Sequence, residues 1–131
     1  AVLCLDVTLR LFIPRGIIMP LIGQPVVKDP LLYLLVGCMF APLVEELFFR
    51  GIVYSWIRRS QSVPVAVLIS AVLFASMHGF LSPVQLIGGI AFAVLYEWRG
   101  SIWAVYVLHC LANAGIWLMG LLYPLFDAWV G

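Results

Sequence analysis

Apolar residues run almost unbroken through the chain, and a few polar positions divide them into segments of helical length. The most polar stretch is Arg-Arg-Ser-Gln-Ser at residues 58–62, which must lie outside hydrocarbon, and Gly100 with Ser101 forms a second break. Long apolar segments separated by such breaks are typical of helices that span a membrane. The pattern predicts helices over residues 30–58, 63–78, 83–99 and 102–123.

Capping residues support two of the predicted helix starts and one helix end. Asp29 before Pro30 and Ser82 before Pro83 are typical starts, because an N-cap oxygen accepts backbone N–H groups and proline suits the first helical position. Gly79 is the expected C-terminal cap of the second helix. The connections are short, so consecutive helices should pack antiparallel.

Three residues inside the predicted helices carry further expectations. Pro42 lacks a backbone N–H and should bend the first helix one turn before Glu45. Gly89 and Ala93 lie four residues apart on the third helix. Small residues at this spacing allow another helix to approach closely.

The first 28 residues differ from the rest of the chain. They are hydrophobic but contain Asp6, Arg10, Arg15 and three prolines, so we interpret them as an interfacial or partial helix with an irregular connection. No repeat or second domain is visible. We predict a single membrane domain over residues 1–131, with a four-helix core over 29–123. The chain begins with Ala1 rather than methionine, which is consistent with a fragment or a processed form.

Composition supports the membrane assignment. The chain is 65% hydrophobic and 10% charged, with a mean hydropathy of +1.15, whereas soluble domains carry about 25% charged residues. A net charge of +1 provides no basic surface for nucleic acid. Cys4, Cys38 and Cys110 form no CxxC pair and are interpreted as small buried hydrophobes.

Two adjacent carboxylates and an arginine interrupt the first predicted helix. Glu45, Glu46 and Arg50 stand within a strongly apolar stretch, and charged groups at such a depth are costly and usually functional. Glu46 and Arg50 are four residues apart and should form a structural ion pair. Glu45 has Phe49 at the same spacing and so has no partner on its own helix, which makes it the candidate general base.

The remaining polar residues of the core fall at a similar depth. Measured from the polar ends of the helices at about 1.5 Å per residue, Glu45 and Glu46 lie about 18 to 20 Å deep, His78 about 21 to 23 Å and Asn113 about 17 Å. His109 lies about 11 Å deep, one turn away on the same helix face as Asn113. The chain contains only two histidines, and both are near this layer.

A glutamate and two histidines in a dry pocket suit hydrolysis by an activated water. The carboxylate can take a proton from water, while imidazoles position that water and stabilise an oxyanion. Glu45, His78 and His109 could instead hold a divalent metal such as zinc with an open position. A proton-coupled carrier and a non-catalytic immunity or scaffold protein remain alternatives. Ser76 lies near His78, but no motif supports a Ser-His pair.

Three motifs occur in order along the core: EExxxR at residues 45–50, FxxxH at 74–78 and HxxxN at 109–113. Together they resemble the motifs of the CAAX protease and bacteriocin-processing family of intramembrane proteases. The resemblance covers residues 31–123. Any one of these motifs is weak, but the ordered set is specific.

The resemblance implies an all-α, glutamate-dependent intramembrane endopeptidase that needs no cofactor and acts on a membrane-anchored peptide or protein. It implies a prokaryotic plasma-membrane protein in contact with lipid. Glu45 would activate the water with His78, and His109 with Asn113 would stabilise the oxyanion. The supporting residues would be Glu46, Arg50 and Phe74.

The arginines predict the orientation in the membrane. Arg58, Arg59 and Arg99 fall at the same end of the predicted helices. Cytoplasmic loops carry an excess of lysine and arginine, so we expect this end to be cytoplasmic.

Overall fold

The computed structural model describes residues 29–78 and 83–130, with side chains up to residue 122. Within these residues it contains helices and short connections and no strand, so the predicted all-α class is confirmed. The expectations for residues 1–28, Gly79 and Ser82 lie outside the described residues. The elements are α3 (Pro30–Leu35), η1 (Val36–Phe40), α4 (Ala41–Glu46), η2 (Leu47–Tyr54), α5 (Ser55–Arg58), α6 (Val63–Met77), α7 (Pro83–Arg99) and α8 (Ile102–Val130).

The chain divides into two compact units. The unit of residues 29–114 contains α3 to α7 and the first part of α8, and it carries all the candidate site residues. The other unit comprises residues 1–28 and 115–131. The part of that second unit that the structure describes is the C-terminal portion of α8, which is helical to Val130.

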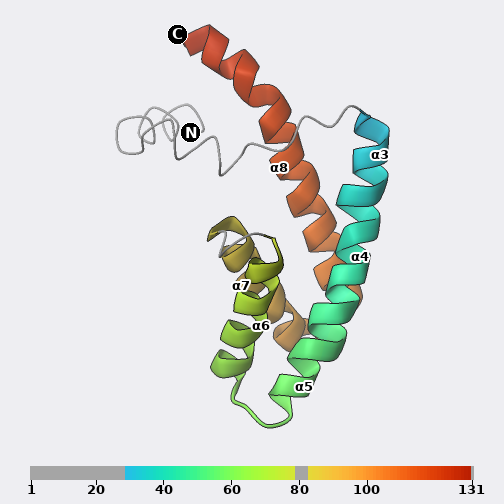
Figure 1. The fold of residues 1–131 in the computed structure, drawn as a ribbon, viewed down its shortest axis with the longest axis vertical. Coiled ribbons are helices and arrows are strands. Elements are labelled where there is room, and N and C mark those ends of the chain that lie inside the picture. The colour runs from blue at the N-terminus through green and yellow to red at the C-terminus, as the bar shows by residue number, and fades with distance from the viewer. Residues whose placement is uncertain (1–28, 79–82, 131) are drawn as a thin grey trace. The chain divides into compact units, whose positions relative to one another are not determined.

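The helix predicted over residues 30–58 is confirmed as a continuous helical course from α3 to α5 (Figure 1). Asp29 caps it as expected, since its Oδ1 accepts the backbone N–H of Leu32 at 3.1 Å. The elements η1 and η2 within it are π-helical. The helix passes Pro42 without interruption, and η1 ends two residues before the proline. Short π-helical segments are rare and often mark functional sites.

Helices α6 and α7 lie side by side and pack closely (Figure 1). A Cβ added at Gly89 would lie 3.0 Å from the backbone Cα of Ala71, and Ala93 is fully buried. The close approach that these small residues predicted is therefore confirmed. The second helix ends at Met77, and His78 is its C-terminal cap residue.

The predicted end of the last helix at residue 123 was wrong. Helix α8 continues through Pro124 to Val130. Proline is tolerated within membrane helices, because neighbouring groups and local adjustment compensate for the missing N–H. Its start agrees with the prediction, and Gly100 has a φ of 62° in the turn from α7. This left-handed conformation favours glycine because it has no Cβ.

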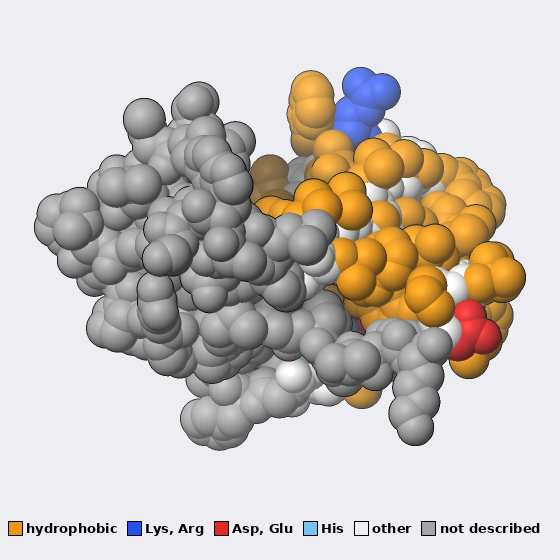
Figure 2. Space-filling view, turned by 90° about the horizontal axis from the view of Figure 1, so that it is seen from above, with side chains coloured by type: hydrophobic (Ala, Val, Ile, Leu, Met, Phe, Trp, Pro, Cys, Tyr) orange, Lys and Arg blue, Asp and Glu red, His pale blue; other side chains and the backbone are white. Residues whose placement is uncertain are grey.

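The apolar residues of this protein lie largely on its surface. Two helices, Pro30–Arg58 and Ile102–Leu122, are long and apolar enough to cross a membrane, and only 17% and 11% of their most apolar windows are buried. The core helix of a soluble protein would instead be mostly buried. Figure 2 shows hydrophobic side chains over nearly all of the described surface in that view. We conclude that this is an integral membrane protein.

Polar side chains tie two helix ends together. Arg58 at the end of α5 pairs with Glu97 of α7, with 3.2 Å between Nε and Oε1. The hydroxyl of Tyr54 donates to Oε2 of Glu97 at 2.7 Å. Arg99 ends the same helix as Glu97, so the expected grouping of Arg58 with Arg99 at one end is confirmed.

Candidate active site

The candidate site residues come from four elements of the unit of residues 29–114. Glu45 and Glu46 end α4, Arg50 lies in η2, His78 caps α6, and His109 lies on α8. The structure brings these five side chains into one connected polar cluster.

Glu45 lies between the two histidines. Its Oε1 is 3.5 Å from Nε2 of His78, and its Oε2 is 3.6 Å from Nε2 of His109. The side chain is 24% exposed, and that of His78 is 29% exposed, so both can be reached from outside the packed core. Oε2 of Glu45 is itself buried and has no hydrogen-bond partner. Buried polar atoms without a protein partner are commonly satisfied by an ordered water.

Glu46 is fully buried and holds two partners. Its Oε2 is 3.1 Å from Nε of Arg50, so the predicted ion pair is confirmed. Its Oε1 is 2.7 Å from Nδ1 of His109, a contact that the sequence did not predict. Glu46 therefore links the structural arginine to a histidine that also faces Glu45.

Arg50 is fully buried among aromatic rings and a backbone carbonyl. Nη2 donates to the carbonyl of Gly89 at 3.0 Å. The guanidinium carbon lies 5.0 Å from the ring centre of Phe74 and 5.4 Å from that of Phe92, within the range of cation–π attraction. Phe74 thus supports the arginine directly. The roles of Gly89 and Phe92 here were missed, because no sequence signal identifies which ring or carbonyl will face a buried guanidinium.

Each histidine is oriented through its Nδ1. In His78, Nδ1 is 2.9 Å from the carbonyl oxygen of Phe74, which can only accept, so Nδ1 carries the proton. In His109, Nδ1 faces the carboxylate of Glu46, and the ring stacks on Phe92 with 4.5 Å between centres. A second group that binds one ring nitrogen fixes the tautomer and the ring orientation. Both rings therefore present Nε2 towards Glu45.

Asn113 lies one turn from the place the depth estimate gave it. Its Nδ2 donates to the carbonyl of Gly37 at 2.9 Å, whereas His109 is the α8 residue at the level of Glu46. The depth estimate assumed that all helices start at the same depth. For α8 the estimated depths are wrong by about one helical turn, because His109 and not Asn113 lies at the level of Glu46. The contact with Gly37 was not predicted, because nothing in the sequence marks that carbonyl as free.

The alternatives to a water-activating glutamate that the structure bears on are a metal site and a serine nucleophile. Among residues 29–78 and 83–122 no group of three His, Cys, Asp or Glu side chains has a geometry suited to a metal ion. The hydroxyl of Ser76 donates to the carbonyl of Leu73 at 2.8 Å, so it is turned to its own helix. The predicted zinc alternative remains a prediction.

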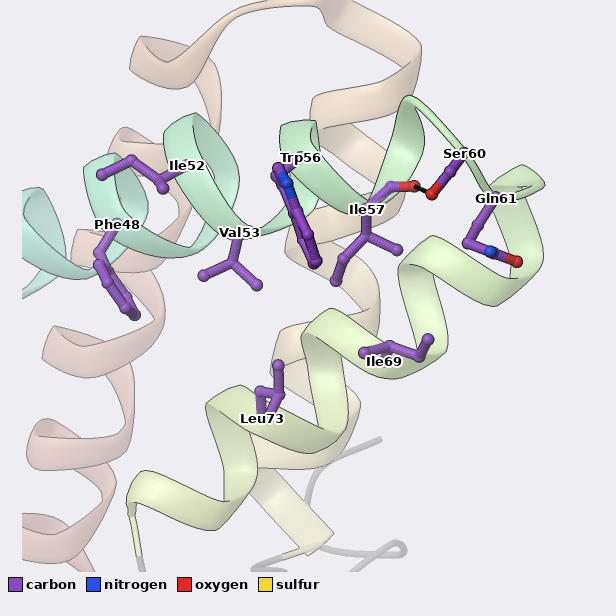
Figure 3. Close-up of a pocket in the computed structure, with 9 residues that line it drawn as sticks. All are labelled: Phe48, Ile52, Val53, Trp56, Ile57, Ser60, Gln61, Ile69 and Leu73. Carbon is purple, nitrogen blue, oxygen red and sulfur yellow. Dashed lines mark hydrogen bonds between the residues drawn. The ribbon is translucent and has the colours of Figure 1, made fainter.

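An apolar hollow of about 550 Å³ lies between the first helical course and α6 (Figure 3). Its walls include Phe48, Trp56 and Leu73, and Ser60 and Gln61 lie at its polar end. None of its lining residues belongs to the polar cluster around Glu45. We therefore place the candidate site on the polar cluster and not in this hollow.

Comparison with known proteins agrees with the motifs. The family described as "Type II CAAX prenyl endopeptidase Rce1-like" matches residues 27–115. The chain is 30% identical over 92 residues to a Bacillus subtilis (strain 168) protein named "Putative membrane peptidase YdiL". The match covers 69% of this chain but only 38% of that relative. No solved structure matches.

Proposed function

Because this chain belongs to the Type II CAAX prenyl endopeptidase Rce1-like family, we propose that it is an intramembrane endopeptidase of the glutamic type. It hydrolyses a peptide bond in a membrane-attached protein or peptide, with no metal. The observation that carries the proposal is the position of Glu45, whose two oxygens face Nε2 of His78 and Nε2 of His109 at 3.5 and 3.6 Å.

Glu45 is the general base in this proposal. It is partly exposed, while Glu46 is fully buried and already engaged by Arg50 and His109, so only Glu45 is free to meet a water and a substrate. A water bound at the carboxylate of Glu45 would give a proton to it as the water oxygen attacks the scissile carbonyl. Glu45 would then return that proton to the leaving amine.

His78 positions the water. Nδ1 donates a hydrogen bond to the Phe74 carbonyl, so the neutral ring has its lone pair on Nε2, beside Glu45. A water beside this pair can donate one hydrogen to Nε2 and the other to the carboxylate, and its lone pairs then point away from both acceptors, towards the substrate. Orientation of this kind lowers the barrier by removing freedom before the reaction starts.

His109 and Asn113 form the side that stabilises the oxyanion. Nε2 of His109 borders the same space as the carboxylate of Glu45. Because Nδ1 gives its hydrogen to Glu46, His109 would act here as an imidazolium, which also carries a hydrogen on Nε2 to donate to the oxyanion. The amide of Asn113 has two N–H groups, and one of them is given to Gly37. In this proposal the other N–H donates to the developing negative charge. Removal of one such donor typically lowers kcat about 10²- to 10³-fold.

The substrate class follows from the setting of the site. The cluster lies on helices whose outer surfaces are apolar, and in this proposal a substrate reaches it from the membrane. A tail that is already attached to the bilayer is concentrated there, whereas a free soluble peptide is not.

We propose a prokaryotic plasma membrane as the location.

The test is incubation of the purified protein in bilayers with a library of membrane-anchored C-terminal peptides, read by mass spectrometry. We expect internal peptide-bond cleavage that Glu45→Gln abolishes. The matched control is Glu97→Gln, since Glu97 lies at the polar end of α7, bound to Arg58 and Tyr54. Cleavage that persists in Glu45→Gln would contradict the proposed mechanism.

A further inference from the structure

The π-helical segment η1 ends next to a proline, and this leaves one carbonyl without a partner on its own helix. The backbone N–H of Ala41 bonds the carbonyl of Val36, five residues back. The next bond in this register would run from residue 42 to the carbonyl of Gly37. Residue 42 is proline, which has no N–H to donate.

The free carbonyl of Gly37 is the one that accepts the side chain of Asn113. Nδ2 of Asn113 donates to it at 2.9 Å, from a residue 76 positions away in the chain. This hydrogen bond is partly buried and lies on a helix apolar enough to cross a membrane, so water cannot readily replace a missing partner there. A carbonyl left unsatisfied in such a place costs free energy, and the asparagine removes that cost.

We propose that Pro42 is a positioning residue that acts through Gly37 on Asn113. Because proline has no backbone N–H, the Gly37 carbonyl stays available to accept a hydrogen bond from the asparagine amide. Because a carbonyl can only accept, this contact holds Nδ2 towards η1 and prevents the amide from turning over. The second N–H of Asn113 then has a defined direction. The kinetic part of this inference rests on the proposed function.

Pro42→Ala restores the missing N–H and tests the inference. In the variant, residue 42 can bond the Gly37 carbonyl, or the segment can return to the α-helical register. In either case a backbone donor competes with Asn113 for its acceptor. Replacing a proline inside a helix by alanine should not itself lower helix stability, because proline is the least favourable residue there. Truncation of the buried ring also removes some packing, which the gain in helix propensity offsets. We therefore expect a loss of function with at most a small loss of stability.

The first readout does not depend on activity. Asn113 is the only asparagine in the chain, so protein labelled with ¹⁵N at asparagine gives a single side-chain amide signal in an NMR spectrum. In the native protein we expect its two protons to be well separated, with a correlation across the hydrogen bond to the ¹³C-labelled carbonyl of Gly37. Pro42→Ala should remove this correlation and bring the two protons together.

The second readout is kinetic. Pro42→Ala should lower kcat at least about tenfold with little change in KM, since a misplaced oxyanion donor affects the transition state more than substrate binding. Adding Asn113→Ala to Pro42→Ala should then cost much less than Asn113→Ala alone. Pro64→Ala is the matched control, because Pro64 lies in the first turn of α6 and should leave both readouts unchanged.

The outcomes separate the two proposals. An unchanged amide signal in Pro42→Ala, or effects of Pro42→Ala and Asn113→Ala that simply add, would overturn the positioning role. If Pro42→Ala does not fold, Pro42→Val replaces it, because valine also has a backbone N–H and fills more of the space of the proline ring. In the native protein, the absence of the correlation between Asn113 and the Gly37 carbonyl would also overturn the inference. If the NMR result is as expected but no peptide is cleaved, the positioning contact stands and the proposed function fails.

Discussion

Oε1 of Glu46 lies 2.7 Å from Nδ1 of His109, with both side chains almost completely buried. The second oxygen of the same carboxylate pairs with Arg50. Glu46 is therefore a bridge between the buried arginine and the histidine that borders Glu45. Its two neighbours make the buried acid structural, while the adjacent acid stays accessible to a water.

Glu46→Gln should destabilise the protein, because it leaves the fully buried Arg50 without its counter-charge. Breaking a buried ion pair by removing one partner costs about 3 kcal/mol or more in free energy of unfolding. Thermal unfolding in detergent is the measurement. Glu97→Gln is the control, since its pair with Arg58 is partly exposed and such pairs contribute about 1 kcal/mol or less. Equal melting temperatures for both variants would contradict this reading of Glu46.

Gly89→Ala should loosen the contact between α6 and α7. The added Cβ would meet the backbone of Ala71 at 3.0 Å, and backbone cannot move aside as a side chain can. It would also shift the carbonyl that accepts from Arg50. We expect a loss of about 1 to 3 kcal/mol in stability, as for other overpacked sites.

The neighbouring glycine provides the control for that substitution. A Cβ at Gly88 would lie 3.6 Å from the ring of Phe92, an ordinary contact. Gly88→Ala should be neutral, or stabilising by up to about 1 kcal/mol through helix propensity. If both alanine variants melt at the wild-type temperature, the close packing at Gly89 does not limit stability.

Most of the helical architecture could be predicted because it follows from local rules. Apolar length, the Asp29 cap and the break at Gly100 depend only on nearby residues, and they gave helix limits close to those observed. The end of α8 was predicted too early, at residue 123. The ion pair of Glu46 with Arg50 was predictable for the same reason, since helical spacing alone brings the two side chains together.

The contacts between helices could not be predicted in the same way. Sequence spacing gives the depth of His109 only to within about a turn, and it does not give the rotation of α8 about its axis. The contact of His109 with Glu46 depends on both. The contact of Asn113 with Gly37 depends in addition on the π-helical register of η1. No local sequence pattern predicted this register.

The orientation in the membrane can be tested at Gln61, an exposed residue in the connection between α5 and α6. Arg58 and Arg99 lie at this end, and the positive-inside rule predicts that it faces the cytoplasm. A cysteine at position 61 should resist a membrane-impermeant maleimide in intact cells and react after permeabilisation. Labelling in intact cells would reverse the orientation.

Activity should survive exhaustive chelation if Glu45 itself activates the water. The measurement is the cleavage rate after dialysis against a strong chelator, together with the metal content of the active protein. Stoichiometric zinc whose removal abolishes cleavage would contradict the proposal. Glu45, His78 and His109 would then be the expected ligands.

Glu45→Gln should abolish cleavage and leave the fold intact. Glutamine has nearly the same volume and can still accept a hydrogen bond, but it cannot take the proton of a water. Glu45 is partly exposed and lies 3.5 Å or more from either histidine, so its charge contributes less to the packed core than that of Glu46. The comparison is thermal stability and cleavage rate for Glu45→Gln and Glu46→Gln together. If Glu45→Gln cleaves normally while Glu46→Gln is folded but inactive, the two acids have exchanged roles, and if both remain active, the glutamate mechanism itself is wrong.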